Sequence, residues 1–128
     1  MTQSLGKILI IEDDRFVRKA YEAKLTLAGF AVITAIDGGE AIELTKTEKP
    51  DLVLLDLMLP VVSGFEYLKV IKENPETKDI PIVIISNLGQ DEDVKRGMDM
   101  GAETYFVKAK VKIEEMVERI KELVAKRA

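Results

Sequence analysis

Polar side chains that could carry out chemistry follow four short apolar runs in this chain of 128 residues. They are three carboxylates, one hydroxyl and one ammonium group, from Glu12, Asp13, Asp56, Ser86 and Lys108. Carboxylates that lie close together repel one another, and some of them bind protons unless a cation lies among them. Oxygen ligands without histidine or cysteine suit a hard cation, with Mg²⁺ as the first candidate. Three carboxylates, one Mg²⁺ and one lysine balance to zero charge, so this set predicts a metal site.

Each of these residues also has a structural interpretation. A serine after a strand is usually a turn hydroxyl, a single lysine is most often a surface residue, and an aspartate can cap the next helix. The capping role is the preferred interpretation of Asp14. Asp56 differs because it lies within the apolar stretch 52–59, where an unpaired charge is costly. Spacing alone therefore leaves a functional carboxylate cluster and a set of structural residues equally open.

Short apolar runs at regular intervals predict the strands of a parallel sheet. The runs do not alternate apolar with polar residues, which is typical of strands buried on both faces. They occupy residues 8–11, 30–33, 52–55, 82–85 and, more weakly, 105–107, and the second of them is followed by Thr34 and Ala35. The segments between them have helical spacing and predict helices over residues 15–28, 39–48, 64–73, 91–100 and 111–126. Phe16 and Leu27 are expected on the apolar face of the first helix, and the charged stretch 72–79 is expected to be an exposed loop.

Five strands that alternate with five helices predict an α/β fold. Right-handed crossovers lead to a doubly wound (βα)5 sandwich of three layers, with a flavodoxin-like parallel sheet of order 2-1-3-4-5. Sheets of this type bind ligands at the carboxyl ends of their strands. The first and third strands are neighbours, so Glu12, Asp13 and Asp56 are expected to converge in one crevice. Ser86 and Lys108 are expected on its far side.

The composition excludes several classes of site. The chain lacks cysteine and histidine, which rules out disulfides, thiolate metal sites and histidine-based acid–base catalysis. Its net charge of −4 disfavours a nucleic-acid-binding domain, although the basic last helix is either a solvated face or a docking face for an acidic partner. No apolar run is long enough for a membrane span, and the first residues lack the apolar core of a signal peptide. We therefore expect a cytoplasmic protein with no membrane and no nucleic acid as partner.

The motifs at the strand ends resemble those of a known family. They are Ile-Ile-Glu12-Asp13-Asp14, Leu-Leu-Asp56-Leu-Met-Leu-Pro60, Gly64, Ser86 and Ala102-Glu-Thr-Tyr105-Phe-Val-Lys108. In this order they resemble the receiver domain of two-component response regulators, the CheY-like superfamily. No single motif is decisive, but the combination is specific. The resemblance implies a single receiver domain over residues 1–128, with its core at about 6–125.

The resemblance implies a phosphoacceptor that depends on Mg²⁺. Asp56 would take a phosphoryl group from a sensor histidine kinase or phosphotransfer protein and form an aspartyl phosphate. Asp13 and Asp56 would bind Mg²⁺ directly, together with the backbone carbonyl of Met58. Glu12 would act mostly through water. The chain would not be an enzyme, beyond self-catalysed phosphorylation and slow autodephosphorylation.

The resemblance also implies a conformational switch. Lys108 would neutralise phosphoryl oxygens, Ser86 would donate a hydrogen bond to them, and Tyr105 would turn inward when Ser86 moves. One hydrogen bond to a charged group contributes about 1.5–3 kcal/mol. A shift in the ratio of active to inactive molecules from 1:99 to 99:1 needs about 5.5 kcal/mol. Ser86 therefore acts with Lys108 and the metal, or the unmodified protein already samples the active state. The output face would be the fourth helix, fifth strand and fifth helix (residues 91–126), and would bind a downstream protein effector or join a homodimer of the otherwise monomeric chain.

The sequence departs from the family pattern after two of the site residues. Ala109 replaces a proline that often follows a cis bond, and a non-proline cis bond costs roughly 2.5–4 kcal/mol. Either the Lys108–Ala109 bond is cis, or it is trans and the loop runs differently. Asn87 replaces a small residue and is expected to narrow phosphoryl access. Met58 and Leu88 are apolar and cannot hold an in-line water, which predicts a long-lived aspartyl phosphate.

Two other functions remain open at this point. One is a phosphorylation-independent interaction module, a pseudo-receiver, which the unusual Ala109 and Asn87 favour. The other is a phosphatase of the haloacid dehalogenase type, which also uses an aspartyl nucleophile. Arg15 is a poor substitute for the hydroxyl residue that such enzymes carry, so this alternative is the weaker one.

Overall fold

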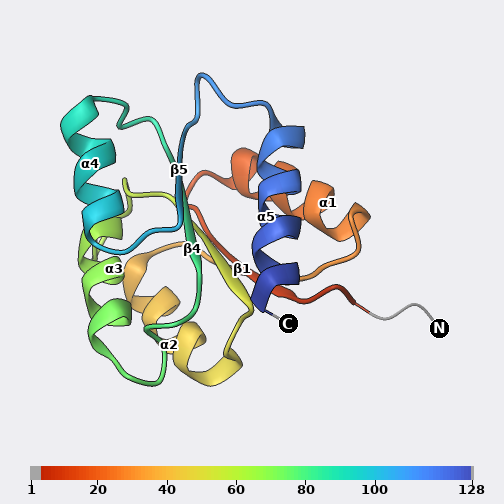
Figure 1. Cartoon of the computed structure of the whole chain (residues 1–128), viewed down its shortest axis with the longest axis horizontal. Coiled ribbons are helices and arrows are strands. Elements are labelled where there is room, and N and C mark those ends of the chain that lie inside the picture. The colour runs from red at the N-terminus through yellow and green to blue at the C-terminus, as the bar shows by residue number, and fades with distance from the viewer. Residues whose placement is uncertain (1–3, 128) are drawn as a thin grey trace.

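The computed structural model describes residues 4–127, in which five parallel strands alternate with five helices (Figure 1). The strands are β1 (Lys7–Ile11), β2 (Ala31–Ala35), β3 (Leu52–Leu55), β4 (Ile82–Ser86) and β5 (Thr104–Val107). The helices are α1 (Arg15–Leu27), α2 (Gly38–Glu48), α3 (Gly64–Glu73), α4 (Asp91–Asp99) and α5 (Ile113–Arg127). The sheet order is β2-β1-β3-β4-β5. This confirms the doubly wound, flavodoxin-like α/β fold predicted from the sequence.

Two apolar cores lie on the two faces of the sheet. Helices α1 and α5 cover one face, and α2, α3 and α4 cover the other (Figure 1). Successive strand residues point to opposite faces, so alternate residues of β1 enter different cores. Ile8 and Ile10 pack with α1 and α5, whereas Leu9 and Ile11 pack on the opposite side. Burial on both faces explains why the strands show no polar alternation.

The apolar face of α1 differs from the sequence prediction. Tyr21 and Leu25 are buried, but Phe16 is 85% exposed and Leu27 is 84% exposed. At 3.6 residues per turn, Phe16 and Leu27 lie about half a turn away from Leu25, on the opposite side of the helix. The prediction that Phe16 and Leu27 face the core is therefore wrong.

The charged stretch 72–79 is only partly the exposed loop that its composition predicts. Helix α3 continues through Glu73, and Thr77 is buried in the turn that follows. The Thr77 hydroxyl donates a hydrogen bond to the carbonyl oxygen of Ile71 at 2.8 Å. This bond satisfies a carbonyl in the last turn of the helix and ties the following turn to α3.

The helices of residues 4–127 are all too short or too polar to cross a lipid bilayer.

Candidate functional site

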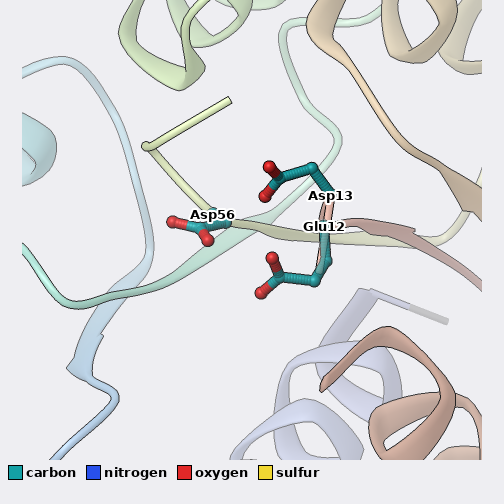
Figure 2. A group of neighbouring side chains, drawn as sticks. All are labelled: Glu12, Asp13 and Asp56. Carbon is teal, nitrogen blue, oxygen red and sulfur yellow. The ribbon is translucent and has the colours of Figure 1, made fainter. Parts of the chain in front are cut away.

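The carboxyl ends of β1 and β3 bring three acidic side chains together. Ile11 pairs with Leu55 in the sheet, so the residues that follow them lie side by side. One carboxylate oxygen each from Glu12, Asp13 and Asp56 lies within 4.8 Å of the other two. Figure 2 shows Glu12 and Asp13 leaving the end of β1 in different directions, with both carboxylates on the side of Asp56. Glu12 and Asp56 are buried, whereas Asp13 is exposed.

Lys108 reaches this cluster from the turn after β5. Its Nζ atom donates to Glu12 Oε1 at 2.6 Å and to Asp56 Oδ2 at 2.8 Å. Strand order alone predicts Lys108 on the far side of the crevice, and the structure brings its side chain into direct contact with two of the carboxylates. The side chain of Lys108 is 15% exposed, that of Glu12 is 2% exposed and that of Asp56 is 5% exposed. Solvent therefore screens the interactions among these three groups only weakly.

The turn after β5 aims Lys108 without the proline that the family usually has. The backbone of residues 4–127 contains no cis peptide bond, so the Lys108–Ala109 bond is trans. The backbone N–H of Lys108 donates to the carbonyl oxygen of Ser86 at 2.9 Å. Lys110 and Val111 both donate backbone hydrogen bonds to the carbonyl of Val107, at 2.9 and 3.1 Å. These bonds close the turn and direct the lysine toward the acidic residues.

Burial is the main influence on the charge state of Glu12. It raises the pKa of Glu12 to about 7, and the negative charge of Asp56 adds to this effect. The hydrogen bond from Lys108 lowers that pKa but is outweighed by burial. Burial would lower the pKa of Lys108, but the hydrogen bonds and charges of Asp56 and Glu12 outweigh it and raise that pKa. Lys108 is therefore charged at neutral pH, while Glu12 is near its titration midpoint.

We expect the metal-free chain to lose stability as the pH rises. An acid whose pKa is raised from 4.5 to about 7 on folding stabilises the fold below pH 4.5, and this contribution is lost as the pH rises through 7. Between pH 5.5 and pH 8 the free energy of unfolding should fall by about 2 kcal/mol. Urea unfolding in the presence of a chelator measures this free energy at each pH. The Glu12→Gln variant has no carboxyl group at this position and should lose most of the pH dependence. An equal pH dependence in both proteins would show that Glu12 is not its source.

The donor set fits a hard metal cation. It offers only carboxylate oxygens, and both carboxylate groups that carry hydrogen bonds retain unused lone pairs. Glu12 Oε2 accepts from the backbone N–H of Asp14 at 3.1 Å, and Asp56 Oδ1 accepts from that of Met58 at 3.0 Å. These bonds fix the two buried carboxylates in place. The role of the Met58 carbonyl as a ligand stays a prediction.

Ser86 and Tyr105 meet at the backbone of Leu88. The buried Ser86 Oγ accepts a hydrogen bond from the N–H of Leu88 at 3.3 Å, and the Tyr105 hydroxyl donates to the carbonyl of Leu88. Burial, followed by the charges of Asp93 and Asp56, raises the pKa of Tyr105 to about 12, so its hydroxyl keeps its proton. The loop after β4 thus connects the predicted switch residues through a single residue, Leu88.

Some residues that shape the site were not predicted from the sequence. Asp14 caps α1 as expected, accepting from the backbone N–H groups of Phe16 and Val17. The unexpected contact comes from Arg18, whose Nη1 donates to the backbone carbonyls of Glu12 and Asp13. An arginine one turn into a helix gives no sequence signal for a contact with carbonyl groups.

A family model described as the response regulator receiver domain matches residues 8–121. The chain belongs to this family. As a receiver domain, it is similar to the "DNA-binding dual master transcriptional regulator RpaA" of Synechocystis sp., with 38% identity over 93% of this chain and 49% of that protein. It is also similar to the "Phosphate regulon transcriptional regulatory protein PhoB" of Klebsiella pneumoniae, with 37% identity over 90% of this chain and 50% of that protein.

Solved structures of receiver domains share the fold. The Francisella response regulator 1452 receiver domain superposes with a TM-score of 0.90 and 27% identity, over 96% of this chain and 99% of that one. The BeF3-activated receiver domain of Klebsiella pneumoniae RstA gives a TM-score of 0.85 and 30% identity, over 92% and 97% of the two chains.

The relatives correct the prediction about partners. The receiver chain spans about half the length of the curated relatives quoted above, which are transcriptional regulators, one of them named as DNA-binding. The prediction of a downstream protein effector and no nucleic acid is therefore wrong. It rested on a net charge of −4, which describes this receiver domain and carries no information on the parts of the relatives that the chain does not cover.

Proposed function

We propose that this receiver domain is a phosphoacceptor of a two-component system, with Asp56 as the accepting residue. The observation that carries the proposal is the buried Asp56 carboxylate held by Lys108 beside Glu12 and Asp13. An Asp56 oxygen would attack the phosphorus of a phosphohistidine on a sensor kinase. The new P–O bond would form as the P–N bond breaks, and the histidine nitrogen would leave with the bond's electron pair.

The residues around Asp56 would supply positioning and charge stabilisation. Asp13, Asp56 and the Met58 carbonyl would hold Mg²⁺, with Glu12 acting mostly through water. When bound, Mg²⁺ supplies positive charge to the phosphoryl oxygens. Lys108 would move its hydrogen bond from Asp56 Oδ2 to a phosphoryl oxygen. The chain would act as an acceptor, not as an enzyme that turns over a separate substrate.

The output would pass through the loop after β4. A hydrogen bond from the Ser86 hydroxyl to the phosphoryl group would pull on the N–H contact with Leu88, and the Tyr105 hydroxyl holds the carbonyl of the same residue. Movement there would alter the face formed by α4, β5 and α5. The transcriptional regulators among the relatives support a nucleic-acid-binding effector as the recipient of this change.

Intact-mass analysis after exposure to acetyl phosphate tests the proposal. We expect a mass gain of one phosphoryl group that requires Mg²⁺ and is absent in the Asp56→Asn variant. Failure of the wild-type chain to gain mass would contradict the proposal and favour a pseudo-receiver. Following the mass over time tests the predicted long lifetime, which rests on the apolar Met58 and Leu88, and complete loss within seconds would refute it.

A further inference from the structure

Arg18 of α1 makes two contacts with the backbone that carries the acidic pair. Its Nη1 atom donates to the carbonyl oxygen of Glu12 at 3.0 Å and to that of Asp13 at 3.3 Å. These two residues lie just beyond the last sheet pair of β1, at Ile11. Their carbonyls have left the regular ladder, and a charged guanidinium makes stronger hydrogen bonds to them than a neutral donor would.

We infer that Arg18 is a positioning residue that aims the Asp13 carboxylate into the acidic cluster, an inference that rests on the proposed function. The Glu12 side chain is held independently, by Lys108 at one oxygen and by the Asp14 N–H at the other. The Asp13 carboxylate is exposed, and none of the side-chain hydrogen bonds within residues 4–127 involves it, so its direction depends on the backbone from which it leaves. Arg18 fixes the peptide groups on both sides of that position.

Fixing these peptide groups limits where the Asp13 side chain can go. The Glu12 carbonyl belongs to the peptide unit before Asp13, and the Asp13 carbonyl belongs to the unit after it. One nitrogen bonded to both carbonyls ties the two units together and restrains the backbone dihedral angles of Asp13. Residues that orient a metal ligand in this way typically change metal affinity by roughly 10- to 100-fold when they are removed.

A purely electrostatic role for Arg18 predicts the opposite result. The guanidinium lies against the backbone that carries Glu12 and Asp13 and would repel a cation bound there, so its removal would strengthen Mg²⁺ binding if charge alone mattered. A positioning role predicts weaker binding after removal. The sign of the change in Mg²⁺ affinity therefore separates the two explanations.

Calorimetric titration of the chain with Mg²⁺ tests the inference directly. We expect Arg18→Met to weaken Mg²⁺ binding by roughly tenfold, at the lower end of the usual range. Arg18→Lys should recover part of the loss, because an ammonium group can donate to both carbonyls. Lys19→Met removes one positive charge from an exposed neighbour on the same helix and should leave the affinity unchanged or slightly higher. Equal or tighter binding by Arg18→Met would overturn the inference.

Two further measurements keep the test decisive. Thermal unfolding shows whether the Arg18→Met variant remains folded. If it does not, the Arg18→Gln variant takes its place. Weaker Mg²⁺ binding by that variant would support the inference, and equal or tighter binding would overturn it. Acetyl phosphate uptake separates this inference from the proposed function. If the wild-type chain binds Mg²⁺ but gains no phosphoryl group, the proposed function is overturned. The role of Arg18 in positioning a ligand for phosphorylation is then overturned as well. Uptake by the wild type, with unchanged Mg²⁺ affinity in the variant, overturns only the role of Arg18.

Discussion

Replacing Lys108 with methionine is expected to lower the free energy of unfolding of the metal-free chain by about 3 kcal/mol at pH 8. Lys108 bonds directly to the two buried carboxylates, and its removal leaves Glu12 and Asp56 facing one another without this cation. Because folding raises the pKa of Lys108, its stabilisation is fully present below the pKa of a free lysine and is lost only at higher pH. At pH 8 the whole contribution is therefore available to be removed.

The loss should shrink in acid and on addition of Mg²⁺. At pH 5.5 the Glu12 carboxyl, with a pKa of about 7, is mostly protonated, so less negative charge remains uncompensated. Mg²⁺ bound to the folded chain stabilises it by mass action and replaces part of the missing positive charge. Urea unfolding at both pH values, with chelator and with Mg²⁺, measures these effects.

The same substitution should slow phosphoryl uptake from acetyl phosphate by about 100-fold or more, because it removes a donor aimed at developing negative charge. Lys110→Met is the matched control, since Lys110 lies in the same turn but is exposed. It should leave both stability and uptake close to those of the wild type. Equal behaviour of the Lys108 and Lys110 variants would contradict the role given to the buried ion pairs.

The fold could be predicted from the sequence because burial in a parallel sheet determines the composition of whole segments of the chain. Apolar runs without alternation indicate burial on both faces, and the two cores around Ile10 and Ile11 bear this out. Helix faces were less predictable. Phe16 and Leu27 are apolar but lie opposite the buried side of α1, since the core takes whichever side of the helix meets the sheet.

The candidate site likewise has one part that the sequence predicts and another part that it does not. The meeting of Glu12, Asp13 and Asp56 follows from strand order, because neighbouring parallel strands end at the same edge. The contacts of Arg18 with carbonyls and of Tyr105 with the Leu88 backbone have no signature in residue type, since every residue has a carbonyl. Such contacts depend on where the turns bring the main chain, which spacing does not specify.

Two adjacent glycines at the start of α2 are expected to respond to alanine in opposite directions. A Cβ atom on Gly38 would lie 2.2 Å from the carbonyl oxygen of Val62 and 2.7 Å from its Cβ. A Cβ atom on Gly39 would meet only the Asp37 side-chain oxygen, at 3.3 Å. Backbone at Val62 cannot swing aside as a side chain can, so Gly38→Ala should cost about 3 kcal/mol of stability, the upper end of typical overpacking. Gly39→Ala should gain up to about 1 kcal/mol, from better helix propensity.

The consequence of the Gly38 substitution should extend to the site, because Val62 belongs to the loop between Asp56 and α3. A shift of this loop would disturb the Met58 N–H that holds Asp56 Oδ1, so Gly38→Ala should also slow phosphoryl uptake, whereas Gly39→Ala should not. Urea unfolding and intact-mass kinetics on both variants provide the two readouts. Similar stability of the two variants would mean that the loop at Val62 can move away from α2 at little cost. The close approach of Gly38 to Val62 would then not help to hold Asp56 in place.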